Sequence, residues 1–183
     1  MRFGGIDIAW STGRSGVCII DTETHFLLLY PDELLEVHFG EGLYFIDAPL
    51  SLPEEGIRNV DKKIRRVTSI PVLPANRKLY PVYLPEEFLG MLKKKKFKEW
   101  EGERTPGFYY AESFVPFLRN QFFGKVKLST TEEYRRVFSK KFGFLPQPPS
   151  PHLMDAYLLA KKAKEAFDGK IKVIEDVDGR IYL

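Results

Sequence analysis

The chain has 183 residues, of which 44% are hydrophobic and 29% are charged, a composition typical of a globular protein and not of a disordered chain. A formal net charge of +3 permits binding to nucleic acid but does not require it. The single cysteine, Cys18, excludes a disulfide within the chain, and no apolar run is long enough to span a bilayer. Because the N-terminus lacks a signal-peptide pattern, we expect a cytoplasmic protein with no membrane partner.

The first 50 residues predict strands joined by short turns. The first two apolar runs are separated by STGRSG, whose glycines and serines indicate a hairpin, and the fourth run, LYFID, ends just before an Ala-Pro pair. Strands are expected at residues 2–10, 16–21, 25–30 and 43–47, with a short helix at 32–37. The first three strands should therefore pair in an antiparallel sheet.

Prolines interrupt the chain between residues 49 and 85, and lysines dominate the segment after them. We expect a helix at 57–67, a lysine-rich helix at 86–100 and a strand at 107–113. Alternating strands and helices predict an α/β protein. Residues 1–183 should form a single domain that carries a Pro/Lys-rich insertion at about 69–106.

The last third of the chain is mainly helical in pattern. Thr130 with Glu133 forms a capping-box sequence and Gly143 a stop signal, which predicts a helix between them after a short strand at 126–129. A longer helix should begin at Ser150-Pro151, with an apolar stripe that packs on the sheet. The chain should close with a hairpin that turns at residues 178–179.

Several acidic residues stand where burial is expected. Asp7 interrupts an apolar strand, and Asp47 ends another, at the edge where open sheets bind ligands. His152 and Asp155 are three residues apart and so share one face of the last long helix, and Glu112 ends a third strand. Simpler interpretations are a turn residue for Asp47, an exposed edge residue for Glu112 and a satisfied core histidine for His152.

If Asp7, Asp47 and Asp155 converge, their charges must be compensated. Two unit charges about 4 Å apart repel by roughly 4 kcal/mol at an effective dielectric constant near 20, so the three either take up protons or bind a cation. Oxygen ligands favour Mg²⁺ or Mn²⁺. Paired ions of this kind hydrolyse phosphodiesters by a two-metal-ion mechanism, so we expect a metal-dependent nuclease.

The same residues carry a resemblance to a known superfamily. The order GIDIA, SGVCIID, IDAPLSLP with RNVD, and HLMDAYLLA resembles the ribonuclease H-like superfamily, and within it an uncharacterised family of predicted nucleases, over residues 3–68 and 107–165. His152, Asp155 and Ala156 match the spacing in Holliday-junction resolvases. The resemblance implies a mixed sheet with its first three strands antiparallel and helices on both faces. It also implies that Asp7, Asp47 and Asp155 bind metal, with Glu112 or His152 completing the site.

Basic residues gather in clusters that could attract a nucleic-acid partner, either DNA or RNA. The second cluster lies in the insertion beside Phe97 and Trp100, which could stack on bases; a solvated surface helix is the simpler interpretation of these lysines. The candidate phosphate-binding residues are Arg58, Lys62, Lys63, Arg65, Arg66, Lys93, Lys94, Lys95, Lys96 and Lys98.

Two other functions remain open from the sequence. The fold could serve as a nucleic-acid- or protein-binding module without turnover, because fold does not establish function. An acidic strand followed by a Ser/Thr/Gly turn also begins the phosphate loop of actin-like and sugar-kinase ATPases, although these normally need a second domain. A homodimer would be required for symmetric cleavage of a junction, and no dimer face is visible in the sequence.

Overall fold

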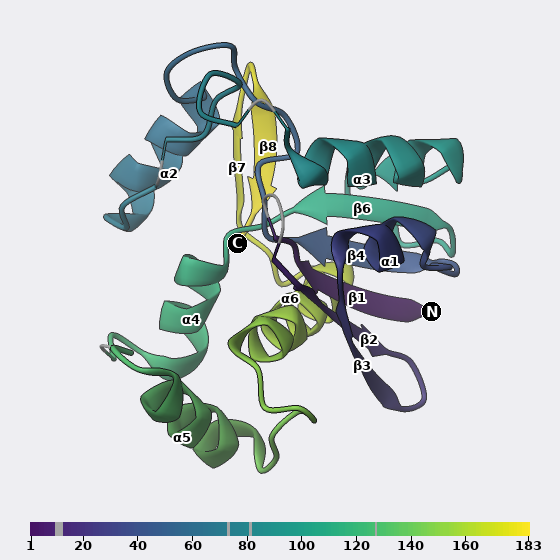
Figure 1. Ribbon diagram of the computed structural model, residues 1–183, viewed down its shortest axis with the longest axis vertical. Coiled ribbons are helices and arrows are strands. Elements are labelled where there is room, and N and C mark those ends of the chain that lie inside the picture. Colours follow the sequence, from purple (N-terminus) through teal and green to yellow (C-terminus); the bar gives the residue numbers. More distant parts are fainter. Residues whose placement is uncertain (10–12, 73, 81, 127) are drawn as a thin grey trace.

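The computed structural model describes residues 1–9, 13–72, 74–80, 82–126 and 128–183. A six-stranded mixed sheet forms its centre, with strand order β3-β2-β1-β4-β6-β5, and a separate hairpin pairs β7 with β8 (Figure 1). The strands are β1 (Arg2–Asp7), β2 (Ser15–Ile20), β3 (Thr24–Leu29), β4 (Gly42–Ile46), β5 (Lys98–Glu99), β6 (Phe108–Glu112), β7 (Val173–Asp176) and β8 (Gly179–Tyr182). The helices are α1 (Pro31–Glu36), α2 (Asn59–Thr68), α3 (Leu84–Lys94), α4 (Val115–Phe123), α5 (Thr131–Phe142) and α6 (Pro151–Phe167).

The sheet changes from antiparallel to parallel at β1. β1 pairs antiparallel with β2, and β2 antiparallel with β3, whereas β4 runs parallel to β1 and β6 parallel to β4. The α/β class and the antiparallel start expected from the sequence are confirmed. The parallel pairing of β1, β4 and β6 brings the carboxyl ends of these strands to one edge of the sheet.

Side chains of the central strand alternate between two cores. Tyr44 and Ile46 of β4 pack with residues of α1 and α3, while Leu43 and Phe45 pack with residues of α4, α5 and α6. This alternation follows from the two-residue period of a strand. Helices therefore cover both faces of the sheet, with α1 and α3 on one side and α6 on the other (Figure 1).

Small residues let α6 approach the sheet closely. A Cβ atom on Gly5 would lie 1.9 Å from the carbonyl oxygen of Ala156, and one on Gly16 would lie 2.2 Å from that of His152. Cys18 is fully buried against the same helix, and burial raises the pKa of its thiol, as expected of an inert core cysteine. This contact brings the first turn of α6 to the ends of β1 and β2.

The terminal hairpin fixes the start of α2. Asp178, in the turn between β7 and β8, accepts a hydrogen bond of 2.9 Å from the backbone N–H of Val60. Such a cap satisfies an amide that the helix itself leaves without a partner. Within the described residues, no helix is both long and apolar enough to cross a membrane.

Most predicted elements are confirmed within a few residues, and the exceptions concern the middle of the chain. The predicted helix at 86–100 runs instead from Leu84 to Lys94 and is followed by the short strand β5. Helix α4 was not predicted. The predicted strand at 126–129 is wrong for 126, 128 and 129, while 127 lies outside the described residues, as do residues 10–12 of the first predicted hairpin.

Two aromatic residues of the insertion also differ from the prediction. Phe97 and Trp100 are 3% and 2% exposed, so neither side chain is free to stack on bases. Phe97 packs against Tyr44 and Phe108, and the Trp100 ring lies 5.2 Å from that of Tyr182. The insertion thus contributes to the core because β5 extends the sheet beside β6.

Candidate active site at the carboxyl ends of β1 and β4

Two aspartates stand at the ends of neighbouring parallel strands. Asp7 is the last residue of β1, not a mid-strand residue as the sequence suggested, and Asp47 directly follows β4. Ile6 and Ile46 are paired in the sheet, and the Asp47 N–H donates to the Ile6 carbonyl at 2.9 Å. The two carboxylates therefore occupy equivalent positions on adjacent strands, at the edge where parallel sheets place ligands.

The first turn of α6 brings a histidine to Asp7. Nδ1 of His152 lies 2.6 Å from Oδ2 of Asp7, and the histidine side chain is 51% exposed. The hydrogen bond with Asp7 raises the pKa of His152, against the opposing effect of partial burial. The pair stands at the protein surface with a proton held between an imidazole and a carboxylate.

Asp155 lies one turn further along α6, deep in the protein. It is 4% exposed and accepts hydrogen bonds from Nε of Arg119 at 2.8 Å and from the Tyr134 hydroxyl at 2.6 Å, both to Oδ1. A second guanidinium nitrogen of Arg119 donates to Oδ2. Arg119 comes from α4 and Tyr134 from α5, so two further helices converge on this carboxylate.

The charge of Asp7 acts on the two other aspartates of the predicted site. Burial raises the pKa of Asp47 well above its usual value, and the charges of Asp7 and Asp155 raise it further, whereas the hydrogen bond from the Val115 N–H lowers it. Burial also raises the pKa of Asp155, and Asp7 adds to this effect while Arg119 opposes it. We refer to Asp7, Asp47 and Asp155, whose charges act on Asp47 and Asp155 in this way, as the aspartate cluster.

Glu112 does not join this cluster. It is paired in the sheet with Ile46, so its side chain lies on the opposite face from the Asp47 side chain. There it accepts hydrogen bonds from Arg58 and from the Leu50 N–H, while Arg58 also holds Asp61 through Nε at 2.9 Å. Burial raises the pKa of Glu112, and Arg58 lowers it. We refer to Arg58, Asp61 and Glu112 as the buried ion cluster.

Most of the predicted phosphate-binding residues lie at the surface. Arg58 is the buried exception among them: it is 3% exposed and directs its donors to the two carboxylates of the buried ion cluster. Lys63 is exposed but donates to the Glu175 carbonyl at 2.7 Å, and the half-buried Lys95 donates to the Val37 carbonyl at 2.8 Å. The other exposed members are Lys62, Arg65 and Arg66 on α2 and Lys93, Lys94, Lys96 and Lys98 in or after α3.

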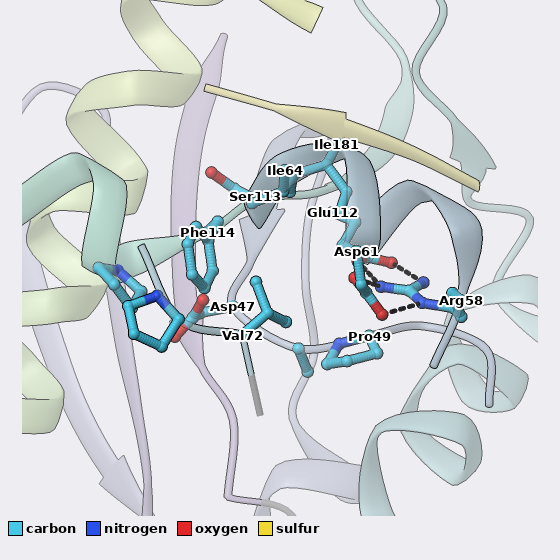
Figure 2. Close-up of a pocket in the computed structure, with 13 residues that line it drawn as sticks. Asp47, Pro49, Arg58, Asp61, Ile64, Val72, Glu112, Ser113, Phe114 and Ile181 are labelled. Atoms are coloured by element: carbon cyan, nitrogen blue, oxygen red, sulfur yellow. Dashed lines mark hydrogen bonds and ion pairs between the residues drawn. The ribbon is translucent and has the colours of Figure 1, made fainter. Parts of the chain in front are cut away.

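A pocket of about 300 Å³ joins the two acidic sites. Figure 2 shows the buried ion cluster on one side of it and Asp47 with Phe114 on the other. Its other lining residues are mostly apolar and come from α2, α4, β8 and the loops after β4, α2 and β6: Ala48, Pro49, Ile64, Pro71, Val72, Ser113, Pro116 and Ile181.

Arg119 and Tyr134 are the residues that sequence reasoning did not find. They lie 36 and 21 positions before Asp155, on helices whose packing no local pattern reveals. Arg119 belongs to α4, which itself was not predicted. Their role depends on tertiary contacts alone.

The described residues contain no group of three histidine, cysteine, aspartate or glutamate side chains arranged to hold a metal ion. The oxygens of Asp155 instead accept hydrogen bonds from Arg119 and Tyr134. Comparisons with family models, with curated proteins and with solved structures found no match to the chain. The function must therefore be argued from the site.

Proposed function

We propose that the protein is a Mg²⁺- or Mn²⁺-dependent nuclease of ribonuclease H-like fold that hydrolyses phosphodiester bonds of nucleic acid. The observation that carries this proposal is the approach of Asp7, Asp47 and Asp155 from β1, β4 and α6, where the charges of Asp7 and Asp155 add to burial in raising the pKa of Asp47. The sheet order, with three antiparallel strands followed by parallel ones, supports the fold assignment.

The donor set has the chemistry that these ions prefer. Three carboxylates offer hard oxygen ligands, and a divalent cation would offset both the cost of burying Asp47 and Asp155 and the repulsion from Asp7, which together raise the pKa of the two groups. When bound, such ions activate water and stabilise the leaving oxygen of a phosphodiester. Asp155 becomes available as a ligand once Arg119, which is 34% exposed, turns away from it.

His152 and Arg119 have further roles in this proposal. His152 is half exposed and bonded to Asp7, so it can take up or release a proton beside the reacting group. Arg119, when released from Asp155, has a guanidinium that fits the oxygens of a phosphate. The exposed basic residues of α2 and α3 would attract the polyanionic substrate.

The test compares the parent protein with Asp7→Asn, using labelled single- and double-stranded DNA and RNA with Mn²⁺. We expect cleavage by the parent and a loss of at least about a hundredfold in the variant, with nucleic-acid binding retained. Asp32→Asn, at an exposed position of α1, is the control and should cleave normally. Equal cleavage by the parent and Asp7→Asn would exclude this site.

One observation favours a second function, a nucleic-acid-binding module without turnover. Arg119 already forms an ion pair with Asp155 and the Tyr134 hydroxyl donates to it, which is how a structural buried carboxylate is satisfied. In that case the parent would bind nucleic acid in a salt-dependent manner and cleave none of the substrates. Calorimetry would then detect no Mn²⁺ binding.

A further inference from the structure

The pocket between Asp47 and the buried ion cluster has the properties of a ligand site. Its volume of about 300 Å³ is at the lower end of the range of about 300–1,000 Å³ for small-molecule sites. This volume suits one planar ring system and not an extended chain of nucleotides.

The walls of the pocket favour a flat, apolar ligand. Pro49 and Val72 lie along one side, Ile64 and Ile181 line another, and the half-buried ring of Phe114 faces the space between them (Figure 2). Unstacked bases bind in this manner, with their faces against aromatic and apolar side chains.

The polar groups of the pocket favour a hydrogen-bond donor over an anion. Among the residues that the structure describes, Asp47, Asp61 and Glu112 line it together with one cation, Arg58, whose donors are directed to Asp61 and Glu112. A lining rich in carboxyl oxygens accepts hydrogen bonds from N–H donors. Oδ1 of Asp47 already accepts from the Val115 N–H at 2.9 Å, whereas Oδ2 has no hydrogen-bond donor in the described part of the chain.

We propose that this pocket binds an unpaired adenine or cytosine through its exocyclic amino group, next to the phosphodiester that the aspartate cluster cleaves. The proposal rests on the nuclease function, because Asp47 belongs to both sites and so ties the position of the base to that of the scissile bond. The amino group faces the carboxylates, and the ring lies between Phe114 and Val72. The substrate is therefore single-stranded at this position or has its base turned out of the helix.

The test measures nucleoside binding to the full chain in EDTA, by calorimetry or ligand-observed NMR. Adenosine and cytidine should bind about tenfold or more tightly than inosine and uridine, which present a carbonyl oxygen where the amino donor stood. Equal affinity for all four nucleosides, or no saturable binding by any, would overturn the proposal.

Variants locate the bound nucleoside. Val72→Trp fills the pocket from a half-buried loop position and should weaken adenosine binding at least about tenfold, whereas Val82→Trp, at a site 68% exposed and outside the pocket, should not. Phe114→Leu keeps an apolar side chain and should weaken binding several-fold through loss of stacking. Unchanged adenosine binding by folded Val72→Trp and Phe114→Leu would overturn the assignment to this pocket.

The two proposals fail separately. Selective nucleoside binding without Mn²⁺-dependent cleavage would support the pocket and overturn the nuclease function. If Asp7→Asn abolishes cleavage but nucleosides with and without the amino group bind equally well, the nuclease function is supported and the proposal for the pocket is overturned.

Discussion

Arg119 of α4 holds Asp155 of α6 with two donor nitrogens, and its Nε lies 2.8 Å from Oδ1. The guanidinium carbon also lies 4.6 Å from the centre of the Tyr134 ring. Because the side chain of Arg119 is 34% exposed while that of Asp155 is 5% exposed, the cation can leave for solvent and the carboxylate cannot. In the proposed nuclease, this ion pair is the contact that a metal ion would have to displace.

Replacement of Arg119 by methionine should therefore separate stability from metal affinity. Without metal, we expect Arg119→Met to lower the free energy of unfolding by about 2 kcal/mol, less than the roughly 3–5 kcal/mol of a fully buried pair because Arg119 is partly exposed. Its affinity for Mn²⁺ should rise, since the competing cation is gone. Urea unfolding in EDTA and calorimetric titration with Mn²⁺ measure the two effects.

Arg136→Met is the matched control for this experiment. Arg136 lies exposed on α5, and its loss should change neither quantity by more than about 0.5 kcal/mol. A lower Mn²⁺ affinity in Arg119→Met than in the parent would contradict the competition between Arg119 and metal.

The stability of the metal-free protein should fall as the pH rises. Burial and neighbouring charges raise the pKa of Asp47 in the folded state, so the folded protein keeps a proton that the unfolded chain releases near pH 4. The free energy of unfolding then decreases from about pH 4 up through the raised folded-state value. Asp155 acts in the same direction, with a folded pKa of about 6.

Asp47→Asn removes one of these groups and can retain the acceptor for the Val115 N–H. In EDTA we expect the variant to be more stable than the parent near pH 8 and to show a flatter pH profile. Mn²⁺ should stabilise the parent at that pH and the variant much less. Thermal unfolding across the pH range, with and without Mn²⁺, measures both effects. A steeper pH profile in Asp47→Asn than in the parent would show that the Asp47 carboxylate does not cause the loss of stability at high pH.

Removing the cation of the buried ion cluster should lower the free energy of unfolding more than removing the charge of one carboxylate. Arg58→Met leaves Asp61 and Glu112 buried without a cation and should lower the free energy of unfolding by about 3–5 kcal/mol. Glu112→Gln leaves one ion pair and an amide that still accepts hydrogen bonds, so its effect should be much smaller. Arg65→Met, at an exposed position in the last turn of α2, serves as the control in urea unfolding. Similar losses of stability for Arg58→Met and Glu112→Gln would contradict this account.

The exposed basic residues of α2 should account for part of the salt dependence of nucleic-acid binding. For a single strand, three phosphate contacts by Lys62, Arg65 and Arg66 contribute about 2 to the steepness with which the logarithm of affinity falls with the logarithm of salt concentration. In fluorescence anisotropy titrations, the variant with glutamine at all three positions should show a slope that is smaller by this amount. Lys140→Gln with Lys141→Gln on α5 is the control; an unchanged slope in the α2 variant would remove this surface from the interface.

Much of the fold was accessible from the sequence because its signals are local. Alternating or continuous apolar runs predicted the first four strands, and the capping pair Thr130 and Glu133 predicted the start of α5, where both reciprocal hydrogen bonds form. The break between strand and turn was less clear at Asp7, because the apolar run continues past the end of the strand. Helix α4 escaped prediction because its apolar positions show no clean stripe against the polar ones.

The sequence by itself determined the kind of protein, an α/β chain with aspartates in or at the end of two strands and at one helix start, because strand period, helix caps and turns depend on neighbouring residues. The tertiary structure decided which charges meet. Strand pairing put Glu112 across the sheet from Asp47, and helix packing brought Arg119 and Tyr134 to Asp155. Contacts between residues so far apart depend on how whole elements pack, and no short stretch of sequence encodes that.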